Sequence, residues 1–277
     1  MKRFFATALA ATVALMPFSA LADACKNETL KRVESRGKLV VGVKADYKPF
    51  GYRDENGKIV GFEIDMAQQV ADTLGVNLEL VPVIASNRMQ FLQQGQIDLM
   101  IATMTDTPDR RGIVGIVGPN YYASGTTALV PKALKITKWD DLRDKPVCGN
   151  QGSFYLQNLE QKYGAKILAF GNAAEAKQAL RDKKCVAFVY DDTSIRADYA
   201  SGGWDDFEIP LASEDFQPWG MAVAKPEEKC ALGEIVSGLQ YNWHRDGWLI
   251  EQEKKWGLYP SSYVADLHKK LADPQAK

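Results

Sequence analysis

The stretch "IATMTDTPDRR", residues 101–111, places hydroxyl groups and guanidinium groups together at the end of an apolar run. The preceding "QIDLMIA" has the apolar character of a buried strand. Thr103 and Thr105 then offer hydroxyls, and Arg110 and Arg111 offer two adjacent planar cations. A guanidinium is the side chain best matched to a carboxylate, which it can bind through two parallel hydrogen bonds. The stretch therefore indicates a site for an anionic oxygen group at a strand end.

Other predicted strands also end in donors and charges. In open parallel sheets, ligands bind beyond the carboxyl ends of the strands. Taken singly, each of these residues could equally be a solvated loop residue, but together they predict a polar small-molecule cleft between two lobes. The residues that follow the strands are Lys44, Asp46, Tyr47, Asn87, Arg88, Thr103, Thr105 and Arg110 in a first series, and Gln151, Gly152, Ser153 and Asp191 in a second.

Strands and helices alternate along the chain in two series. In the helix predicted over 61–75, Phe62, Met66, Val70 and Leu74 form an apolar stripe at i, i+4 spacing, and a glycine ends it. This alternation predicts an α/β fold with two parallel-type sheets covered by helices. The predicted strands are 38–43, 77–83 and 97–103 in the first series and 146–149, 165–170 and 185–192 in the second, with a break around 119–131.

Length and composition predict a globular, exported protein. The chain has 277 residues, of which 46% are hydrophobic and 25% charged, with a formal net charge of −1. Such a near-neutral chain without a basic block does not suggest a nucleic-acid partner. Residues 1–22 combine a basic start, an apolar run and the small-residue sequence "ALA", which is typical of a signal peptide cleaved after Ala22. We therefore expect a periplasmic location.

The four cysteines, Cys25, Cys148, Cys185 and Cys230, would enter an oxidising compartment. An even number of cysteines there predicts two disulfides. Sequence alone allows three connectivities. His244 and His268 lie in the C-terminal region, away from every predicted strand end, and we expect both at the surface. No metal site and no cofactor site is predicted.

Three motifs, "GFEIDMA", "TDTPDR" and "VYDD", occur in an order and spacing that resemble the family 3 periplasmic solute-binding proteins, the amino-acid receptors of ABC importers. The run "YKPFGYRDENGKIVGFEID" and the closing "KKWGL" are also typical of that family. The resemblance covers nearly all of the chain after the signal peptide. It implies a two-lobed periplasmic binding protein fold of type II with a two-strand hinge. The lobes would be 23–125 with 222–277, and 126–221.

The resemblance also implies how an amino acid is held. Arg110 would bind the α-carboxylate, together with the hydroxyl and N–H of Thr105 and the carbonyl of Thr103. Ser153 and the amides near Gly152 would approach the same carboxylate from the other lobe. Asp191 would pair with the α-ammonium group. Arg111 remains a rival for the carboxylate, because the stretch that follows Arg110 is one residue longer than the family pattern.

Two cations, Lys44 and Arg88, are left for the ligand's side chain, and this pattern is nearest to that of the glutamate/aspartate-binding members. An acidic side chain would supply the counter-charge that they need. Another polar amino acid stays open, because Asp46 or Glu63 could neutralise Lys44 instead. By the same resemblance, Tyr47 would pack against the carbon chain of the ligand.

We expect a binding protein rather than an enzyme, since the sequence has no G-x-S-x-G, G-x-G-x-x-G, H-E-x-x-H or C-x-x-C motif. The expected partners are a free amino acid and the inner-membrane permease subunits of an ABC transporter, and the receptor itself would be a monomer. The alternative is a cyclohexadienyl dehydratase, an enzyme that resembles these receptors and acts on prephenate or arogenate. Its dicarboxylate substrate would also suit Lys44 and Arg88.

The lobe division that the resemblance implies also bears on the cysteines. Cys25 and Cys230 would share the first lobe, and Cys148 and Cys185 the second. A disulfide between lobes would restrain closure, because its Cα atoms must stay within about 7 Å of each other. We therefore expect the pairs Cys25–Cys230 and Cys148–Cys185.

Overall fold

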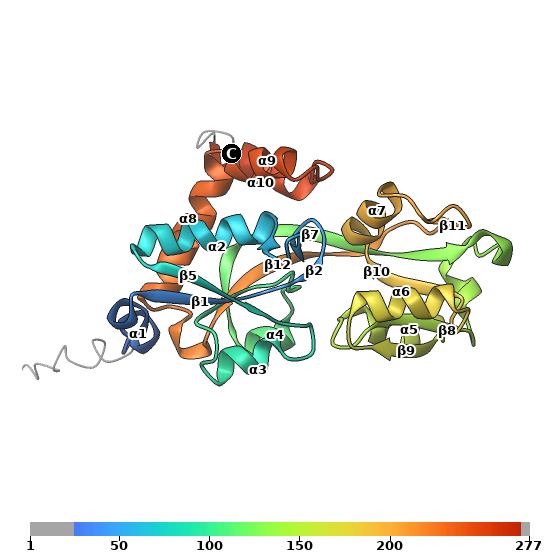
Figure 1. Cartoon of the computed structure of the whole chain (residues 1–277), viewed down its shortest axis with the longest axis horizontal. Helices are drawn as coiled ribbons and strands as arrows, with labels where there is room; N and C mark the ends of the chain where they lie inside the picture. Colours follow the sequence, from blue (N-terminus) through green and yellow to red (C-terminus); the bar gives the residue numbers. More distant parts are fainter. Residues whose placement is uncertain (1–24, 273–277) are drawn as a thin grey trace, which may run out of the picture.

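The computed structural model describes residues 25–272, so the predicted signal peptide lies outside the described residues. Two bodies stand side by side and are joined by long strands (Figure 1). We call residues 25–125 together with 222–272 the first lobe, and residues 126–221 the second lobe. The boundaries expected from the sequence fall inside the two long strands, β7 (Gly115–Pro131) and β12 (Glu214–Val223).

The first lobe is built on three parallel strands in the order β5-β1-β6. Figure 1 shows α2 on one side of these strands and α3 and α4 on the other. A small antiparallel sheet, β2-β3-β4, follows β1. The elements of the first lobe before the hinge are α1 Glu28–Arg36, β1 Lys38–Val43, β2 Asp46–Tyr47, β3 Gly51–Arg53, β4 Ile59–Val60, α2 Phe62–Leu74, β5 Asn77–Pro82, α3 Arg88–Gln93, β6 Leu99–Ile101 and α4 Pro108–Ile113.

The second lobe carries the parallel strands β10-β8-β9. After β12 the chain returns to the first lobe, where the last three helices pack (Figure 1). The elements of the second lobe are η2 Lys132–Leu134, η3 Trp139–Leu142, β8 Pro146–Asn150, α5 Tyr155–Tyr163, β9 Lys166–Phe170, α6 Ala173–Arg181, β10 Ala187–Asp191, α7 Asp192–Ala200 and β11 Phe207–Glu208, and those of the return segment are η4 Lys225–Glu227, α8 Ala231–Arg245, α9 Trp248–Lys255 and α10 Ser262–Ala272.

The hydrogen bonding of the two sheets is continuous through the hinge, which the sequence did not predict. Strands β7 and β12 pair antiparallel with each other, while β12 also pairs with β6 and β7 with β10. The whole order is therefore β5-β1-β6-β12-β7-β10-β8-β9. The cause is the length of β7, whose 17 residues cross both lobes. Its first half belongs to one sheet and its second half to the other.

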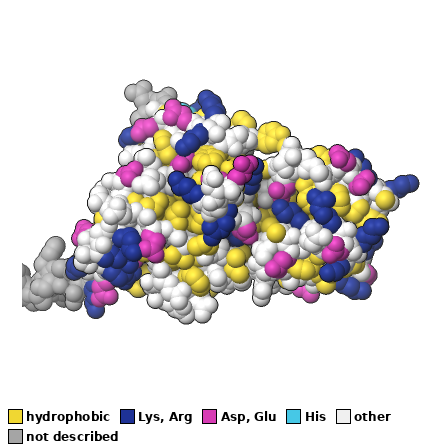
Figure 2. Space-filling model, in the orientation of Figure 1, with side chains coloured by type: hydrophobic (Ala, Val, Ile, Leu, Met, Phe, Trp, Pro, Cys, Tyr) yellow, Lys and Arg dark blue, Asp and Glu magenta, His cyan; other side chains and the backbone are white. Residues whose placement is uncertain are grey.

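The core of the first lobe confirms the apolar stripe of α2. Phe62, Met66 and Val70 are buried there, and Gly75 ends the helix in the left-handed conformation, where a side chain would be strained. No helix within residues 25–272 is both long enough and apolar enough to cross a bilayer. Basic and acidic side chains are interspersed on the face shown in Figure 2, consistent with the near-neutral composition.

Two disulfides are present, each within one lobe. Cys25 is bonded to Cys230 with Cα atoms 5.3 Å apart, and Cys148 is bonded to Cys185 with Cα atoms 5.7 Å apart. Both pairs are those expected from the lobe division. The first ties the start of the described chain to the N-cap of α8, and the second joins β8 to the residue two positions before β10.

The surface position expected for both histidines is wrong for His244, which is fully buried. It lies on the face of α8 that packs on β7, and its Nε2 is 2.8 Å from the carbonyl oxygen of Asn120. Gln240, one helical turn earlier, donates to the carbonyl oxygen of Val117 on the same strand. These two side chains satisfy the carbonyls of a buried strand, and sequence spacing alone did not reveal this role.

Candidate functional site

A small buried pocket lies between the lobes, and seven of the ten residues predicted to bind the ligand line it. In the first lobe, β1 and β6 are parallel neighbours with Val43 opposite Ile101, so the residues that follow them emerge at one edge. In the second lobe, β8 and β10 are likewise parallel neighbours. The predicted residues that line the pocket are Lys44, Arg88, Thr103, Thr105, Arg110, Ser153 and Asp191.

The aromatic part of the wall was missed by the sequence analysis. Phe154, Tyr155 and Tyr190 line the pocket from the second lobe, and Ala85 lines it from the first. The signal was available, since Phe154 and Tyr155 come directly after Ser153, and Tyr190 precedes Asp191. Tyr47 is the one aromatic residue that the sequence pattern assigned to the wall. These rings supply apolar area around the charged groups.

Arg110 lies in the pocket because of the local structure that precedes it. Thr107 caps α4, with its hydroxyl accepting from the N–H of Arg110, and Pro108 occupies the first turn. The guanidinium of Arg110 donates to the carbonyl of Thr105 at 2.9 Å and to that of Gly152, in the other lobe, at 3.0 Å. Burial and the nearby charge of Arg88 lower the pKa of Arg110 to about 9, so it stays protonated at neutral pH.

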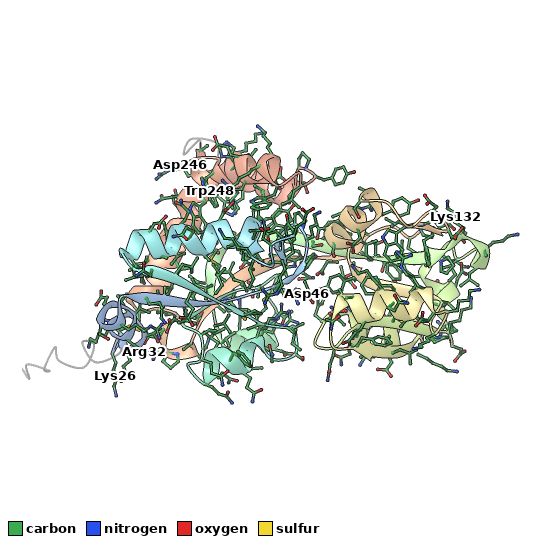
Figure 3. The ribbon with its side chains drawn as sticks, viewed as in Figure 1. Lys26, Arg32, Asp46, Lys132, Asp246 and Trp248 are labelled. Carbon is green, nitrogen blue, oxygen red and sulfur yellow. A yellow bond between two sulfur atoms is a disulfide. The ribbon has the colours of Figure 1, made fainter. Side chains whose placement is uncertain are left out.

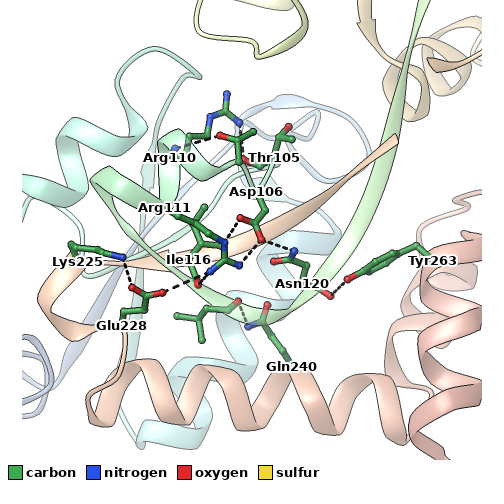
Figure 4. Close-up of polar contacts among 12 residues, drawn as sticks. Thr105, Asp106, Arg110, Arg111, Ile116, Asn120, Lys225, Glu228, Gln240 and Tyr263 are labelled. Carbon is green, nitrogen blue, oxygen red and sulfur yellow. Dashed lines mark hydrogen bonds and ion pairs between the residues drawn. The ribbon is translucent and has the colours of Figure 1, made fainter. Parts of the chain in front are cut away.

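Arg111 points away from the pocket and is held in an ion pair (Figure 4). Its Nε and Nη2 each lie 2.6 Å from a carboxylate oxygen of Asp106, and its Nη1 donates to the carbonyl of Ile116 at 3.1 Å. Glu228 adds a second acidic group at 3.8 Å. The two adjacent arginines therefore face different surroundings, and of the two only Arg110 lines the pocket.

Thr103 is held by charged side chains on both sides of its backbone. Its N–H donates to Oε1 of Glu63 at 2.7 Å, and its carbonyl accepts from Nη1 of Arg88 at 3.2 Å. The backbone φ of Thr103 is +46°, a left-handed conformation that is uncommon for a β-branched residue. Glu63 also accepts from the hydroxyl of Tyr121, and burial raises the pKa of Glu63 to about 7. These hydrogen bonds stabilise a strained backbone at the pocket wall.

Arg88 is directed at both the backbone and the pocket. Its Nη1 donates to the carbonyls of Ala102 and Thr103, while its Nε is buried with no hydrogen-bond partner among the described residues. Burial lowers the pKa of Arg88. Part of this guanidinium therefore supports the strand end, and the rest can bind a ligand oxygen.

Asp46 and Tyr47 do not line the pocket, in contrast to the prediction. Asp46 forms an ion pair with Lys44, whose Nζ lies 2.8 Å from Oδ1 of the aspartate. The ring of Tyr47 is buried against Phe50 and Tyr190, and its hydroxyl donates to Oδ2 of Asp191 at 3.1 Å. Both residues therefore support side chains of the pocket wall from behind.

Gly152 also lies outside the pocket lining, but its carbonyl accepts from Arg110. Its φ is +83°, and a Cβ added there would lie 2.8 Å from the carbonyl carbon of Ala85 and 2.9 Å from the amide nitrogen of Ser86. Glycine is thus required both by the backbone conformation and by the approach of the other lobe. Ser153 follows, with its N–H donating to the carbonyl of Asn150 and its side chain lining the pocket.

Asp191 is the acidic residue of the pocket wall, and it lies at the end of β10. Burial raises its pKa to about 7, against an ordinary value of 3.8, and the hydrogen bond from Tyr47 acts in the opposite direction. An ammonium group placed beside this carboxylate would stabilise its charged form. The walls of the pocket therefore offer one partner for a cation, Asp191, and three basic partners for anions, and because its volume is about 10 Å³ the lobes must separate to admit an amino acid.

A second, larger cavity of about 590 Å³ lies beside the hinge strands, and its four charged lining residues, Lys48, Asp192, Arg196 and Asp198, are spread over a much larger wall. Two of its acidic residues already have partners, since Asp192 accepts from Ser124 and Gly125, and Asp198 pairs with Lys177. Within residues 25–272 no group of histidine, cysteine or acidic side chains could hold a metal ion. The pocket between the lobes is the candidate site.

Comparison of the sequence with known proteins identifies the family of this chain. The model of the bacterial extracellular solute-binding proteins, family 3, matches residues 39–259. An ABC transporter glutamine-binding protein of Bacillus subtilis is 31% identical over 273 residues, which cover 92% of this chain and 97% of the relative. A glutamate/aspartate import solute-binding protein of Salmonella typhimurium is 24% identical over 247 residues, which cover 84% of this chain and 80% of the relative.

A solved structure shares the fold. It is the crystal structure of an ancestral amino acid-binding protein described as a precursor of cyclohexadienyl dehydratase. The similarity has a TM-score of 0.72 at 33% identity and covers 82% of this chain and 99% of that one. The two-lobed α/β fold predicted from the sequence is confirmed by this match.

Proposed function

The chain belongs to family 3 of the bacterial extracellular solute-binding proteins, and from that premise we propose that it is the receptor of an ABC importer for a free amino acid. The main support is the presence of Arg110 and Asp191 in one buried pocket. Arg110, with Thr105 and Ser153, would bind the α-carboxylate, and Asp191 would bind the α-ammonium. Both charges of the ligand would then be paired, as burial requires.

Binding is proposed to close the two lobes. The first lobe would comprise 23–125 and 222–277 and the second 126–221, with β7 and β12 bending between them. The direct contact of Arg110 with Gly152 supports this, because the carboxylate site is complete only when the lobes meet. Closure by a hinge of this kind buries a ligand between domains.

We further propose an acidic ligand, glutamate or aspartate. Lys44 and Arg88 line the pocket in addition to the Arg110 and Asp191 pair, whereas Asp46 and Glu63 lie behind the lining. The wall that would face the ligand side chain is therefore positive. Such a wall favours an oxygen-bearing side chain and disfavours lysine or arginine as ligands.

Glutamine is the second candidate. Lys44 already has an ion-pair partner in Asp46, and Arg88 already donates to two backbone carbonyls. The wall is thus less positive than a count of its cations suggests. A neutral amide oxygen would then suffice, and the Bacillus subtilis relative is named as a glutamine-binding protein.

Catalysis on this fold is the competing class. The ancestral relative described as a precursor of cyclohexadienyl dehydratase makes a dicarboxylate substrate such as prephenate worth testing. Asp191 argues against prephenate as a substrate, because prephenate has no ammonium group to pair with it, whereas arogenate has one and needs the direct test. Incubation with prephenate or arogenate should give no aromatic product, and turnover would refute the receptor.

The receptor is proposed to act in the periplasm as a monomer and to deliver its ligand to inner-membrane permease subunits. The basic and apolar character of residues 1–22 supports export, with cleavage after Ala22. N-terminal sequencing of the exported protein should begin at Asp23. An uncleaved chain in the cytoplasm would contradict this location.

A thermal-shift screen against the twenty amino acids tests the function directly. A ligand at a hundredfold excess over its Kd stabilises the folded protein by about 2.7 kcal/mol, enough to raise Tm by several degrees. Glutamate or aspartate should give the largest shift, followed by glutamine. A screen in which no amino acid raises Tm would refute the receptor, and a preference for arginine or lysine would refute the acidic ligand.

A further inference from the structure

Lys44 and Asp46 form an ion pair that is unequally exposed. The side chain of Lys44 is 1% exposed and lines the pocket, whereas that of Asp46 is 26% exposed, with both carboxylate oxygens buried, and does not line it. Figure 3 shows Asp46 on the side of the first lobe that faces the second lobe. Of this pair, the lysine therefore faces the pocket and the aspartate does not.

The pair is a consequence of local structure. Lys44 directly follows β1, and Asp46 begins β2, where it pairs with Tyr52 of β3. Among residues 25–272, Asp46 is the one acidic residue that forms a salt bridge with this buried lysine. A buried ammonium without a partner is costly, so the aspartate compensates a charge that the pocket requires.

The charge of Asp46 also reaches the opposite wall of the pocket. Burial and the charge of Asp191 raise the pKa of Tyr190, which lines the pocket from the second lobe, and the charge of Asp46 adds to them. A carboxylate on the ligand side chain that binds Lys44 would therefore lie near a second carboxylate. Because Lys44 is already paired with Asp46, a ligand carboxylate gains less from that ammonium than it would from an unpaired lysine, whereas a neutral amide loses little.

We propose that Asp46 is a specificity residue of the site. By pairing with Lys44 it partly neutralises the ammonium charge, and it thereby limits the preference of the pocket for ligands with acidic side chains over ligands with amide side chains. This inference rests on the proposed amino-acid receptor. Asp46 acts through Lys44 and does not touch the ligand. Removal of the Asp46 carboxylate should raise the affinity for acidic amino acids relative to their amides, whichever ligand the unaltered protein prefers.

Calorimetric titration of Asp46→Asn with glutamate, glutamine, aspartate and asparagine tests the proposal. The ratio of glutamate affinity to glutamine affinity should rise by ~10-fold to 100-fold relative to the unaltered protein, and the aspartate to asparagine ratio should rise likewise. Unchanged ratios in Asp46→Asn would overturn the proposal. If Asp46→Asn does not fold, Asp46→Ser is measured in its place by the same ratios.

The chain offers a matched control in Asp65. Its side chain is 27% exposed in the same lobe, and it pairs at 2.7 Å with Lys255, which is 55% exposed, so Asp65→Asn removes the same charge from a solvent-exposed ion pair away from the pocket. Asp65→Asn should leave both ratios within about twofold of their original values. An equal rise in this control would show a bulk charge effect and overturn the role of Asp46.

The role of Lys44 is tested by a double-mutant cycle. In a Lys44→Met background, Asp46→Asn should change the glutamate to glutamine ratio much less than it does alone. An undiminished change would overturn the action through Lys44. A failure of the proposed function looks different, because no amino acid would then raise the Tm of the unaltered protein.

Discussion

The hydroxyl of Tyr47 in β2 donates a hydrogen bond of 3.1 Å to Oδ2 of Asp191 at the end of β10, and so joins the first lobe directly to the second. The same hydroxyl lies 3.0 Å from Oγ1 of Thr193. Asp191 is the proposed partner of the ligand ammonium. Tyr47 therefore both orients that carboxylate and stabilises the closed arrangement of the lobes.

Tyr47→Phe should weaken amino-acid binding while leaving the fold intact. The ring and its contacts with Phe50 and Tyr190 remain, and only the interlobe hydrogen bonds are lost. A hydrogen bond of this kind contributes about 0.5–1.5 kcal/mol, so affinity should fall roughly 2-fold to 10-fold in calorimetry. Tyr263→Phe is the control, because its hydroxyl donates to Asn120 within one lobe. Equal losses in both variants would contradict the role of Tyr47.

The binding of the ammonium group should depend on pH through Asp191. Burial raises the pKa of Asp191 to about 7, so its carboxylate becomes protonated as the pH falls below 7. Affinity for the amino acid should therefore decrease between pH 7.5 and pH 5.5. Calorimetry at several pH values measures this, with Asp191→Asn expected to bind weakly throughout. An affinity that is equal at pH 5.5 and pH 7.5 would argue against Asp191 as the ammonium partner.

The free energy of unfolding of the receptor without ligand should change in the opposite direction. Between pH 3.8 and about 7 the folded state keeps the proton of Asp191, while the unfolded state has released it. Stability contributed by this group is therefore lost as pH rises through that window. Glu63, whose pKa is also raised to about 7 by burial, adds to the same trend. Low pH should thus favour the folded receptor and disfavour its complex.

Much of the fold could be predicted because its signals are local. The stripe of Phe62, Met66 and Val70 defines α2, and the alternation of strands with helices defines an α/β protein. Positions at strand ends also follow from local sequence, since parallel strands bring their carboxyl ends together. For this reason Lys44 and Arg110 could be assigned to the pocket before the structure.

The partners of those residues could not be predicted, because they depend on contacts across the chain. Tyr47 and Asp191 are 144 residues apart, and their hydrogen bond exists only where the two lobes meet. Glu63 was seen as part of a helix motif, and its bond to Thr103 depends on how α2 packs beside β6. Sequence pattern assigns a residue to a wall of the pocket, but the neighbouring side chains determine where its charge is directed.

Arg110→Ala should abolish amino-acid binding, and Arg111→Ala should not. Arg110 lines the pocket, whereas Arg111 is paired with Asp106 away from it. Loss of one partner of a buried charge pair costs about 3–5 kcal/mol, which is at least a hundredfold in Kd. Calorimetry on both folded variants makes the comparison. Retained affinity in Arg110→Ala, or a loss of affinity confined to Arg111→Ala, would show that Arg110 does not bind the carboxylate.

Gly152→Ala should prevent the lobes from closing without unfolding either of them. The added Cβ would lie within 3.0 Å of backbone atoms of Ala85 and Ser86, which cannot move aside as a flexible side chain would. Affinity should fall at least tenfold, and small-angle scattering should no longer show the compaction expected when the ligand is added.

Gly202→Ala is the matched control, since Gly202 has a similar φ of +87° but no atom within 4 Å of the added Cβ. It bears a similar backbone strain of roughly 1–2 kcal/mol without the steric conflict. Full affinity in Gly152→Ala, or an equal loss in Gly202→Ala, would show that the approach of Gly152 to the first lobe is not required for binding.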